Sequence, residues 1–267
     1  MAIYKKIDIA SAKPSIDERG DIPHFGIDVI DVDTPFNVAT FIKLYKESVS
    51  FCKEHNKNLI IVGGTSFYLK TLINGISKLP KIDEETKKIV KKKIEDVKEA
   101  YKFLSKIDKE HAKNIMPTDR YRIEKALTIF YQTNIAPSLY FKSNPPKPIA
   151  KDIKLFEISI EKELLNRRIE LRVGQMFKMG LIDEVANLKD RYGKNHNPMK
   201  AIGIKEILDY LDGKYSLNDA KEKIIIHTRQ LAKRQKTFNR TQFLPHVQGD
   251  VKELEQQIVK ILGSRLV

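Results

Sequence analysis

One short apolar run, Leu59–Val62, constrains the fold of this chain more than any other feature. The run is followed at once by Gly63-Gly64-Thr65 and then by a helical pattern. The residues before it mark one face of an amphipathic helix: Val38, Phe41, Ile42, Tyr45 and Val49. A fully apolar strand between two helices is typical of a buried parallel strand. The sequence therefore predicts an α/β core, with residues 63–65 at the sheet edge where such folds bind ligands.

The loop Gly63-Gly64-Thr65 has two interpretations. Two glycines after a strand can simply permit a tight turn, or the loop can be functional through Thr65 at the sheet edge. The motif alone does not separate the two, so Thr65 is a candidate site residue rather than an assigned one.

The character of the sequence changes after Pro80. Residues 81–149 are highly charged, follow a helical period and include a predicted helix at 120–132. Three prolines, Pro145, Pro146 and Pro148, then mark a boundary. A strand at 155–160 and one long helix over 163–188 follow. We therefore predict an α/β core of residues 1–80 and 150–267, split by a mainly helical insertion, 81–149.

A cationic helix is predicted over His227–Arg240. Arg229, Lys233, Lys236 and Arg240 recur at helical spacing, and no Asp or Glu occurs from Lys223 to Gly249. A second stripe would seat this helix on the core: Ile224, Thr228, Leu231, Gln235 and Phe238. The cationic face is either an ordinary solvated surface or a phosphate-binding surface.

The charge of the chain favours the second interpretation. Lys and Arg number 49 against 35 Asp and Glu, which gives a formal charge of +14. Such an excess favours a polyanionic partner, with nucleic acid the first candidate. The sequence has no apolar run of the length a membrane span needs, no secretory signal pattern and a single cysteine, Cys52, which is interpreted as a packed core residue. A cytoplasmic protein without membrane attachment is expected, as a monomer, and no zinc site is expected.

Two arginines on the predicted helix 163–188 are also candidates. Arg168 and Arg172 are four residues apart and share one face, while Ile169, Val173 and Met176 form the apolar stripe. A surface position is the ordinary interpretation of each. The planar guanidinium of Arg172 also suits a diphosphate.

Six segments in one order resemble the tRNA dimethylallyltransferase family over nearly the whole chain. They read as follows: MAIYKKIDIASAKPS, IVGGTSFYLKTLINGISKLP, PTDRYRIEKALTIF, ELLNRRIELRVGQMFKMGLIDEV, MKAIGIKEILDYLDG and TRQLAKRQKTF. The elements Gly63-Gly64-Thr65 with Tyr68, and Arg229–Gln235, carry the resemblance furthest.

The resemblance implies a P-loop-type parallel α/β core with a helical insertion that binds tRNA. It also implies transfer of a dimethylallyl group from dimethylallyl diphosphate to N6 of the adenine next to the anticodon, with the adenine flipped out. Arg172 would steady the diphosphate, and Thr65 would contact the target nucleotide. The other residues that would bind tRNA or diphosphate are Lys87, Tyr121, Arg122, Lys125, Lys200, Lys205, Arg229, Lys233 and Arg234.

The sequence departs from this family in one respect. The family begins with a strand, a G-x-T-x-x-G-K-[ST] loop that cradles diphosphate and binds Mg²⁺, and an Asp-Ser pair whose Asp is the proposed general base. None of these is found in residues 1–267. The expectation is an N-terminally truncated core with little transfer activity and without the family's Mg²⁺ ligand. A start assigned at an internal methionine and a shortened paralogue both explain this.

Two other functions stay open. One is an RNA-binding relative without catalysis. The other is an isopentenyltransferase that acts on free adenine nucleotides, against which the +14 charge argues because a small substrate does not require it.

Overall fold

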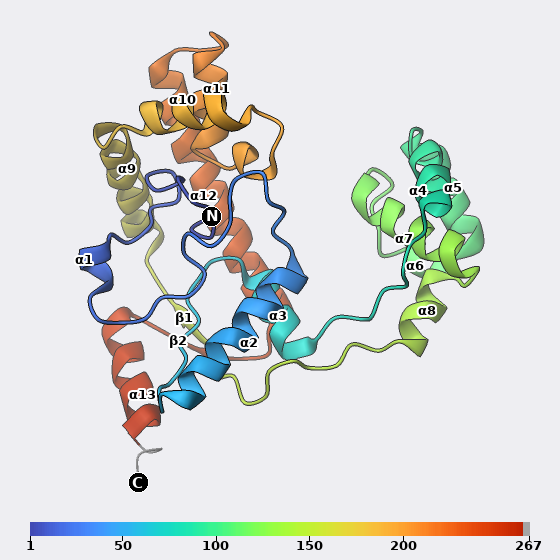
Figure 1. The fold of residues 1–267 in the computed structure, drawn as a ribbon, viewed down its shortest axis with the longest axis horizontal. Coiled ribbons are helices and arrows are strands. Elements are labelled where there is room, and N and C mark those ends of the chain that lie inside the picture. The colour runs from blue at the N-terminus through green and yellow to red at the C-terminus, as the bar shows by residue number, and fades with distance from the viewer. Residues whose placement is uncertain (264–267) are drawn as a thin grey trace. The chain divides into compact units, whose positions relative to one another are not determined.

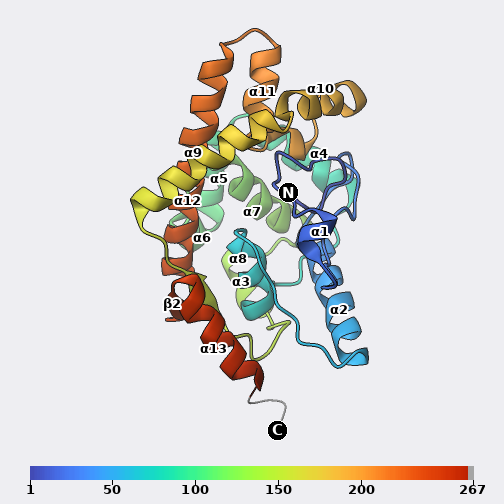
Figure 2. The ribbon, with the colours of Figure 1, turned by 90° about the vertical axis from the view of Figure 1, so that its left-hand side faces the viewer.

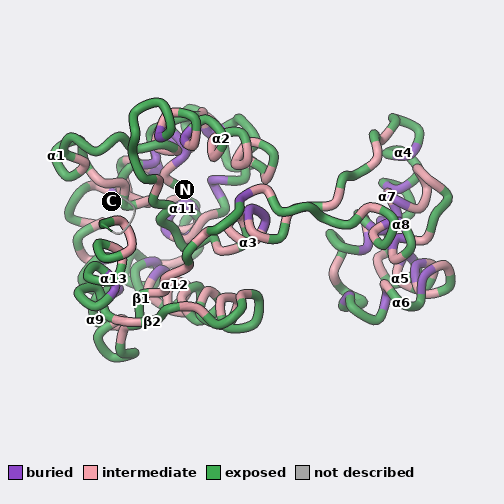
Figure 3. The backbone as a smooth tube through the Cα atoms, turned by 90° about the horizontal axis from the view of Figure 1, so that it is seen from below, coloured by how far each residue is buried: buried purple, intermediate pink, exposed green. Residues whose placement is uncertain are grey.

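A computed structural model describes residues 1–263 and divides them into two compact units. Among the described residues, unit 1 comprises 1–70 and 153–263, and unit 2 comprises Thr71–Asp152. The bounds of unit 2 lie on either side of the predicted insertion, 81–149. Figure 3 shows buried positions inside each unit, so each has a core of its own.

Unit 1 is mostly helical. Its elements, in chain order, are α1 (Ile16–Arg19), α2 (Val38–Glu54), α3 (Ser66–Asn74, which continues into unit 2), β1 (Phe156–Ile158), α9 (Lys162–Lys178), α10 (Leu181–Tyr192), the 3-10 helix η1 (Asn197–Lys200), α11 (Ile204–Leu211), α12 (Leu217–Gln242), β2 (Val247–Gly249) and α13 (Val251–Gly263). The predicted helices at 38–49 and 227–240 are confirmed as parts of α2 and α12. Figures 1 and 2 show α9 and α11 beside the first part of α12, with α10 next to α9 and α11 and the strand pair near the other end of α12.

The core of unit 1 forms where the N-terminal segment meets helices α9 to α12. Ile7, Leu181, Val185, Ile204 and Ile207 are fully buried there. Ala220 and Ile224 connect the first half of α12 to the same core. Cys52 is also buried, as its interpretation as a packing residue predicts.

The β-structure of the described residues is small. β1 and β2 pair in parallel, with Phe156 opposite Val247 and Ile158 opposite Gly249. A parallel bridge joins Tyr4 and Ile30. The predicted strand at 155–160 is therefore confirmed at its centre, and the coarse α/β class holds with a much smaller sheet than expected.

The predicted buried strand Leu59–Val62 is wrong. The segment has no strand geometry, and Ile60 is 61% and Val62 89% exposed. A strand requires a neighbour that takes up its N–H and C=O groups, and residues 1–263 place no strand beside this one. Its apolar composition alone was not enough to form one.

The single helix predicted over 163–188 is two helices. α9 ends at Lys178 and α10 begins at Leu181, with Gly180 between them at φ +97°. This left-handed conformation ends a helix and is accessible to glycine at little cost. Gly180 therefore redirects the chain at a position where the hydrophobic period alone indicated continuity.

Unit 2 is a small helical unit. It contains α4 (Glu84–Lys93), α5 (Val97–Ile107), α6 (Lys109–Ala112), α7 (Arg120–Thr133) and α8 (Pro137–Ser143). Asp83, Asp96 and Asp119 cap α4, α5 and α7 by accepting backbone N–H groups, a common way to begin a helix. Leu104, Ile123 and Leu127 are fully buried in the core. The predicted helix at 120–132 is thus confirmed as α7.

The two chain segments at the edge of unit 2 are joined by their backbones. The N–H groups of Ile149 and Ala150 both donate to the carbonyl oxygen of Leu72, at 2.9 and 3.0 Å. Gly75 lies beside this junction at φ +80°, and a Cβ there would come within 2.0 Å of the Lys147 carbonyl oxygen. Only glycine fits at this position.

We expect Gly75→Ala to destabilise the protein by at least about 2 to 3 kcal/mol, because it adds a clash with backbone to a strained φ. Gly213→Ala is the matched control: Gly213 has φ +72° but nothing within 4 Å of a built Cβ. Its cost should be about 1 kcal/mol, from the dihedral alone. Thermal unfolding followed by circular dichroism measures both. Equal shifts in Tm would contradict the close approach at Gly75.

Candidate functional site

Helix α12 carries the predicted cationic face. Ser216 begins the helix: its side chain accepts the Asp219 N–H at 3.2 Å, and Asp219 accepts the Ser216 N–H at 3.0 Å. Core residues of unit 1 reach α12 at Ala220, Ile224 and Ile225. Leu231, which was predicted to be buried, is 38% exposed because the core does not extend along the second half of the helix. The cationic half of α12 therefore lies at the surface.

The loop of residues 63–65 lies against this second half of α12. A Cβ at Gly64 would come within 2.4 Å of the Gln235 side chain, and Lys70 donates to the Gln242 side chain at 2.6 Å. Neither Gly63 nor Gly64 has positive φ. Gly64 therefore serves a close approach rather than a tight turn, and the Thr65 loop and the cations of α12 belong to one region of unit 1.

The basic residues of this region differ in their surroundings. Lys233 and Arg234 are exposed and line a hollow of about 360 Å³ together with Thr237, Phe238 and Thr241. Arg229 instead forms an ion pair with Glu170 of α9. The lack of Asp and Glu from Lys223 to Gly249 gave no sign of this partner, because Glu170 lies on another helix. The Nε of Arg229 is buried without a hydrogen-bond partner among residues 1–263.

Arg172 lies on the exposed side of α9. Arg168, one turn earlier, is exposed as well, whereas Ile169 and Val173 are buried and Met176 packs against the core. The predicted apolar stripe of this helix is confirmed. The role of Arg172 at a diphosphate stays a prediction.

Lys200 and Lys205 are exposed near the start of α11. Lys205 donates to Asp209 at 2.7 Å, and Lys214 donates to the same carboxylate at 2.5 Å. The hydrogen bond from Lys205, followed by that from Lys214, lowers the pKa of Asp209 to about 2. Lys205 therefore already has an anionic partner that a phosphate would have to replace.

The predicted residues of unit 2 gather near the starts of two helices. Tyr121, Arg122 and Lys125 lie in the first turns of α7, with the Lys125 ammonium 5.5 Å from the centre of the Tyr121 ring. Tyr121 is 68% exposed, which suits an aromatic ring that stacks on a base. Lys87, on α4, pairs with Glu84 at 2.5 Å.

Sequence reasoning missed the residue that holds the N-terminal segment. The Glu184 carboxylate of α10 accepts the backbone N–H groups of Asp8 and Ile9, both at 2.7 Å, and of Ala10 at 2.9 Å. Three donors on one carboxylate make a strong, charge-assisted anchor. Nothing local in the sequence pairs Glu184 with a loop 174 or more residues away.

Lys13 closes the same loop. Its side chain is only 4% exposed, and its ammonium donates to the Tyr4 carbonyl oxygen at 2.6 Å, to Asp8 at 2.7 Å and to Asp28 at 2.5 Å. A buried ammonium is stable only with such partners. Lys13 and Glu184 together fix the N-terminal segment, which is the first of the six segments that carry the resemblance.

A second buried acid, Glu206, holds the turn before α11. Its carboxylate accepts the Gly203 N–H at 2.7 Å and contacts the Nδ1 of His227 at 2.6 Å. Gly203 lies near Ala10: a Cβ placed on Gly203 would be 3.9 Å from the Cβ of Ala10. The three-residue spacing of Gly203 and Glu206 is that of a capping box and was visible in the sequence. His227 was not a predictable partner.

Similarity to known proteins shows which family this chain belongs to. The profile of the IPP transferase family matches residues 2–242. The chain belongs to the IPP transferase family. It is 49% identical to the tRNA dimethylallyltransferase of Sulfurimonas denitrificans over 98% of this chain and 89% of that protein. The tRNA dimethylallyltransferase of Nautilia profundicola is 48% identical, over 97% of this chain and 87% of that protein.

Solved structures agree with this family. The tRNA delta(2)-isopentenylpyrophosphate transferase of Staphylococcus epidermidis is 30% identical with a TM-score of 0.68, over 99% of this chain and 88% of that one. A eukaryotic dimethylallyltransferase acting on tRNA has a TM-score of 0.82 at 25% identity, over all of this chain and 71% of that one. The resemblance inferred from the sequence is therefore confirmed.

Because Glu184 holds three N–H groups, we expect Glu184→Gln to destabilise unit 1 by about 1 to 3 kcal/mol. The neighbouring Asp183→Asn is the control, since Asp183 is exposed in the same helical turn and its loss removes only an interaction with the helix dipole. Hydrogen exchange should speed up at Asp8, Ile9 and Ala10 in the Gln variant alone. Unchanged protection there would show that the anchor is not Glu184.

Proposed function

We propose that this chain acts in the transfer of a dimethylallyl group from dimethylallyl diphosphate to N6 of the adenine next to the tRNA anticodon. The observation that supports this most is the 49% identity, over 98% of the chain, to a tRNA dimethylallyltransferase. The approach of the Thr65 loop to the cationic half of α12 supports it independently, because the reaction brings a nucleotide and an anion together.

The chemistry defines what the residues must do. The N6 nitrogen forms a bond to C1 of the dimethylallyl group as the bond from C1 to the diphosphate oxygen breaks, and N6 loses a proton. The protein orients the base and stabilises the departing diphosphate. We assign the first task to Thr65 and the second to Arg172, whose planar guanidinium can bind two oxygens.

Recognition of tRNA is assigned to basic residues of both units. Lys200, Lys205, Arg229, Lys233 and Arg234 of unit 1 would contact phosphates, as would Lys87, Arg122 and Lys125 of unit 2. Tyr121 would stack on a base. The adenine must leave the stacked loop to react, which splays the nucleotides and makes such contacts possible.

No step is assigned here to Mg²⁺ or to a general base. Residues 1–263 hold no cluster of three or more His, Cys, Asp and Glu side chains able to bind a metal ion, and the full sequence has no glycine-rich loop ending in Lys-Ser or Lys-Thr. The residues present do not fit the ion, so Mg²⁺ stays an expectation from the resemblance.

Location and assembly also belong to the proposal. A cytoplasmic monomer is our proposal from the sequence pattern. Within residues 1–263, no helix has both the length and the apolar composition that a membrane span requires.

The decisive experiment is transfer itself. The chain is incubated with tRNA, dimethylallyl diphosphate and Mg²⁺, and the digested nucleosides are analysed by mass spectrometry. Dimethylallyladenosine next to the anticodon supports the proposal. Binding without product would fit both an RNA-binding relative and the low activity expected without the glycine-rich loop, and product on free AMP but not on tRNA would identify an enzyme for free nucleotides.

We expect tRNA binding to depend steeply on salt, and Lys233→Ala/Arg234→Ala to weaken it. If each side chain neutralises one phosphate, the slope of log K against log salt should fall by about 1.4 to 1.8. Lys221→Ala/Lys223→Ala is the matched control, with the same charge change at the other end of α12. Filter binding at several salt concentrations measures the slopes. Equal slopes for the two double variants would show that the Lys233 and Arg234 face of α12 does not contact tRNA.

In catalytically active protein, we expect Arg172→Ala to lower kcat by a factor of about 10² to 10³, as for the loss of one preorganised donor to developing charge. Arg172→Lys should restore little, because lysine lacks the planar fork. Arg168→Ala, one turn away on the same exposed side, should leave kcat within a few fold. Near-normal turnover of the Lys variant would reduce Arg172 to a general cation.

A further inference from the structure

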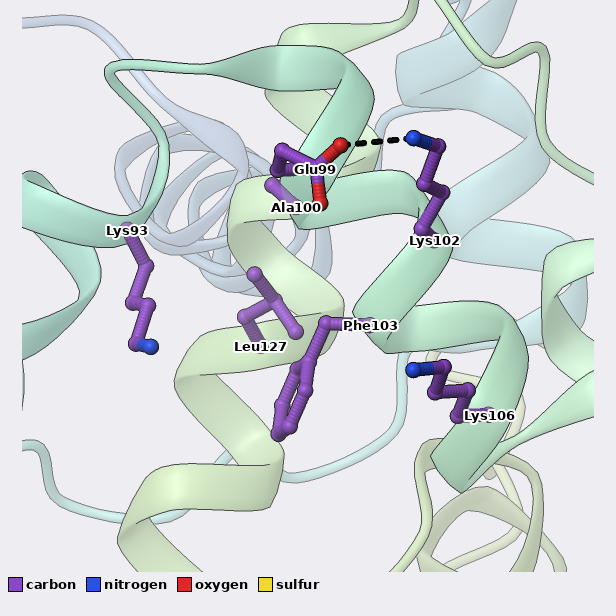
Figure 4. A pocket seen from close by; sticks show the side chains of 7 residues that line it. All are labelled: Lys93, Glu99, Ala100, Lys102, Phe103, Lys106 and Leu127. Carbon is purple, nitrogen blue, oxygen red and sulfur yellow. Dashed lines mark hydrogen bonds and ion pairs between the residues drawn. The ribbon is translucent and has the colours of Figure 1, made fainter.

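Unit 2 has a hollow that is lined by none of the predicted site residues. It measures about 250 Å³ and lies between α5 and α7, where it is lined by Lys93, Glu99, Ala100, Lys102, Phe103, Lys106 and Leu127 (Figure 4). Ala100 and Leu127 are buried and make an apolar floor with the Phe103 ring. Three lysines surround this floor. We call this hollow the Phe103 pocket.

Neighbouring groups fix the Phe103 ring. It stacks with Tyr131 at a centroid distance of 5.9 Å and an interplanar angle of 11°, and it meets the edge of Phe130 at 5.9 Å. The Lys93 ammonium lies 5.8 Å from the ring centre. Figure 4 shows Lys93 and Lys106 on either side of the ring. The pocket thus combines a preorganised aromatic surface with ammonium groups within reach of it.

The Phe103 pocket is separate from the predicted basic face of α7. At 3.6 residues per turn, Leu127 points about half a turn away from Lys125, two positions earlier, and about a third of a turn away from Tyr121, six positions earlier. Leu127 is fully buried, whereas Tyr121 is 68% exposed. A ligand in the pocket would therefore meet another side of unit 2.

Charge selects the class of ligand. Unit 2 has eighteen Lys and Arg against eleven Asp and Glu, so an excess of positive charge surrounds the pocket. One acid lies in the pocket itself: Glu99 accepts a hydrogen bond from Lys102 at 2.6 Å and raises its pKa. An incoming phosphate would have to compete with this carboxylate for Lys102.

We propose that the Phe103 pocket binds one nucleotide of an RNA strand, with its base against the Phe103 ring and its flanking phosphates on Lys102 and Lys106. This inference rests on the proposed function, since it adds a contact to the same tRNA substrate. Stacking on an aromatic ring beside cations is a common way to hold an unpaired nucleotide. A pocket of 250 Å³ is smaller than most sites for free ligands, which favours one contact among several along a polymer.

The lysines are tested by charge-matched variants of the full chain. Lys102→Gln/Lys106→Gln should weaken binding of a short unstructured RNA by about 5- to 30-fold near 0.1 M salt, and should lower the salt slope by about 1.4. Lys109→Gln/Lys113→Gln removes the same charge from α6 and its C-terminal end, outside the pocket. Fluorescence anisotropy of labelled RNA measures both. Equal losses of RNA affinity in the two double variants would show a general charge effect and would overturn the proposal that the pocket binds RNA.

Glu99 provides a test in the opposite direction. Glu99→Gln frees Lys102 and removes a negative charge, so RNA binding should tighten by about 3- to 5-fold. The gain should not exceed the affinity that one phosphate contact contributes. The control is Glu110→Gln, because Glu110 also pairs with a lysine, Lys142 at 2.9 Å, and is 63% exposed against 65% for Glu99. A gain in both variants alike would contradict a specific contact at Lys102.

Photocrosslinking tests the base contact. RNA containing 5-iodouracil should crosslink to Phe103, located by mass spectrometry of the peptides, and Phe103→Leu should abolish the crosslink while keeping the apolar volume and the helical circular dichroism. No crosslink on α5 in the wild type would overturn the base contact. Full competition by AMP at equal nucleotide concentration would assign the pocket to a free nucleotide instead.

The outcomes separate this inference from the proposed function. If the wild type transfers the dimethylallyl group to tRNA while the pocket variants bind RNA as the controls do, only the pocket fails. If the wild type binds no RNA, both fail.

Discussion

The attachment of α12 to the core of unit 1 is the constraint on which the rest of this unit depends. Ala220 and Ile224 hold the first half of the helix against the core that it shares with α9 and α11, and the second half continues beyond that core. A continuous helix is stiff, so burial at one end positions the exposed cations at the other. The Thr65 loop then meets the exposed half through Gly64 and Lys70. Precision at the candidate site is therefore set by packing at some distance from it.

Polar anchors complete what the apolar core begins. Glu184 and Lys13 fix the N-terminal segment, and Glu206 fixes the turn at Gly203, beside Ala10. These groups bind backbone atoms of loops, which have no regular hydrogen-bond ladder of their own. Loops that carry function need such support, because a displacement of about 1 Å is enough to impair catalysis. Glu184 therefore holds residues 8–10, and Glu206 joins the turn at Gly203 to His227 of α12.

The sequence predicted this protein unevenly, for physical reasons. Helices with a long hydrophobic period, such as α2, α7 and α12, were predicted correctly because the period extends over several turns. Leu59–Val62 was predicted wrongly as a strand, since pairing depends on a neighbour that a local pattern cannot supply. The turn at Gly180 was missed because the apolar period runs through it. The ion pair of Arg229 with Glu170 and the anchor at Glu184 link distant segments, so only the folded chain reveals them. The family could be identified from the sequence because six of its motifs occur in the same order.

The exposed run Leu59–Val62 also has a consequence for how this protein behaves in solution. Three uncharged residues of this run with high strand propensity, Ile60, Ile61 and Val62, lie at the surface with backbone groups outside any sheet of the described residues. Such a segment can pair with the same segment of another molecule, edge to edge, and each pairing leaves a further edge open. Association of this kind rises with concentration and is not suppressed by the +14 charge once salt screens it. The salt that is expected to weaken the proposed RNA binding would thus also favour self-association, so dilute protein at low ionic strength is the condition in which the two can be told apart.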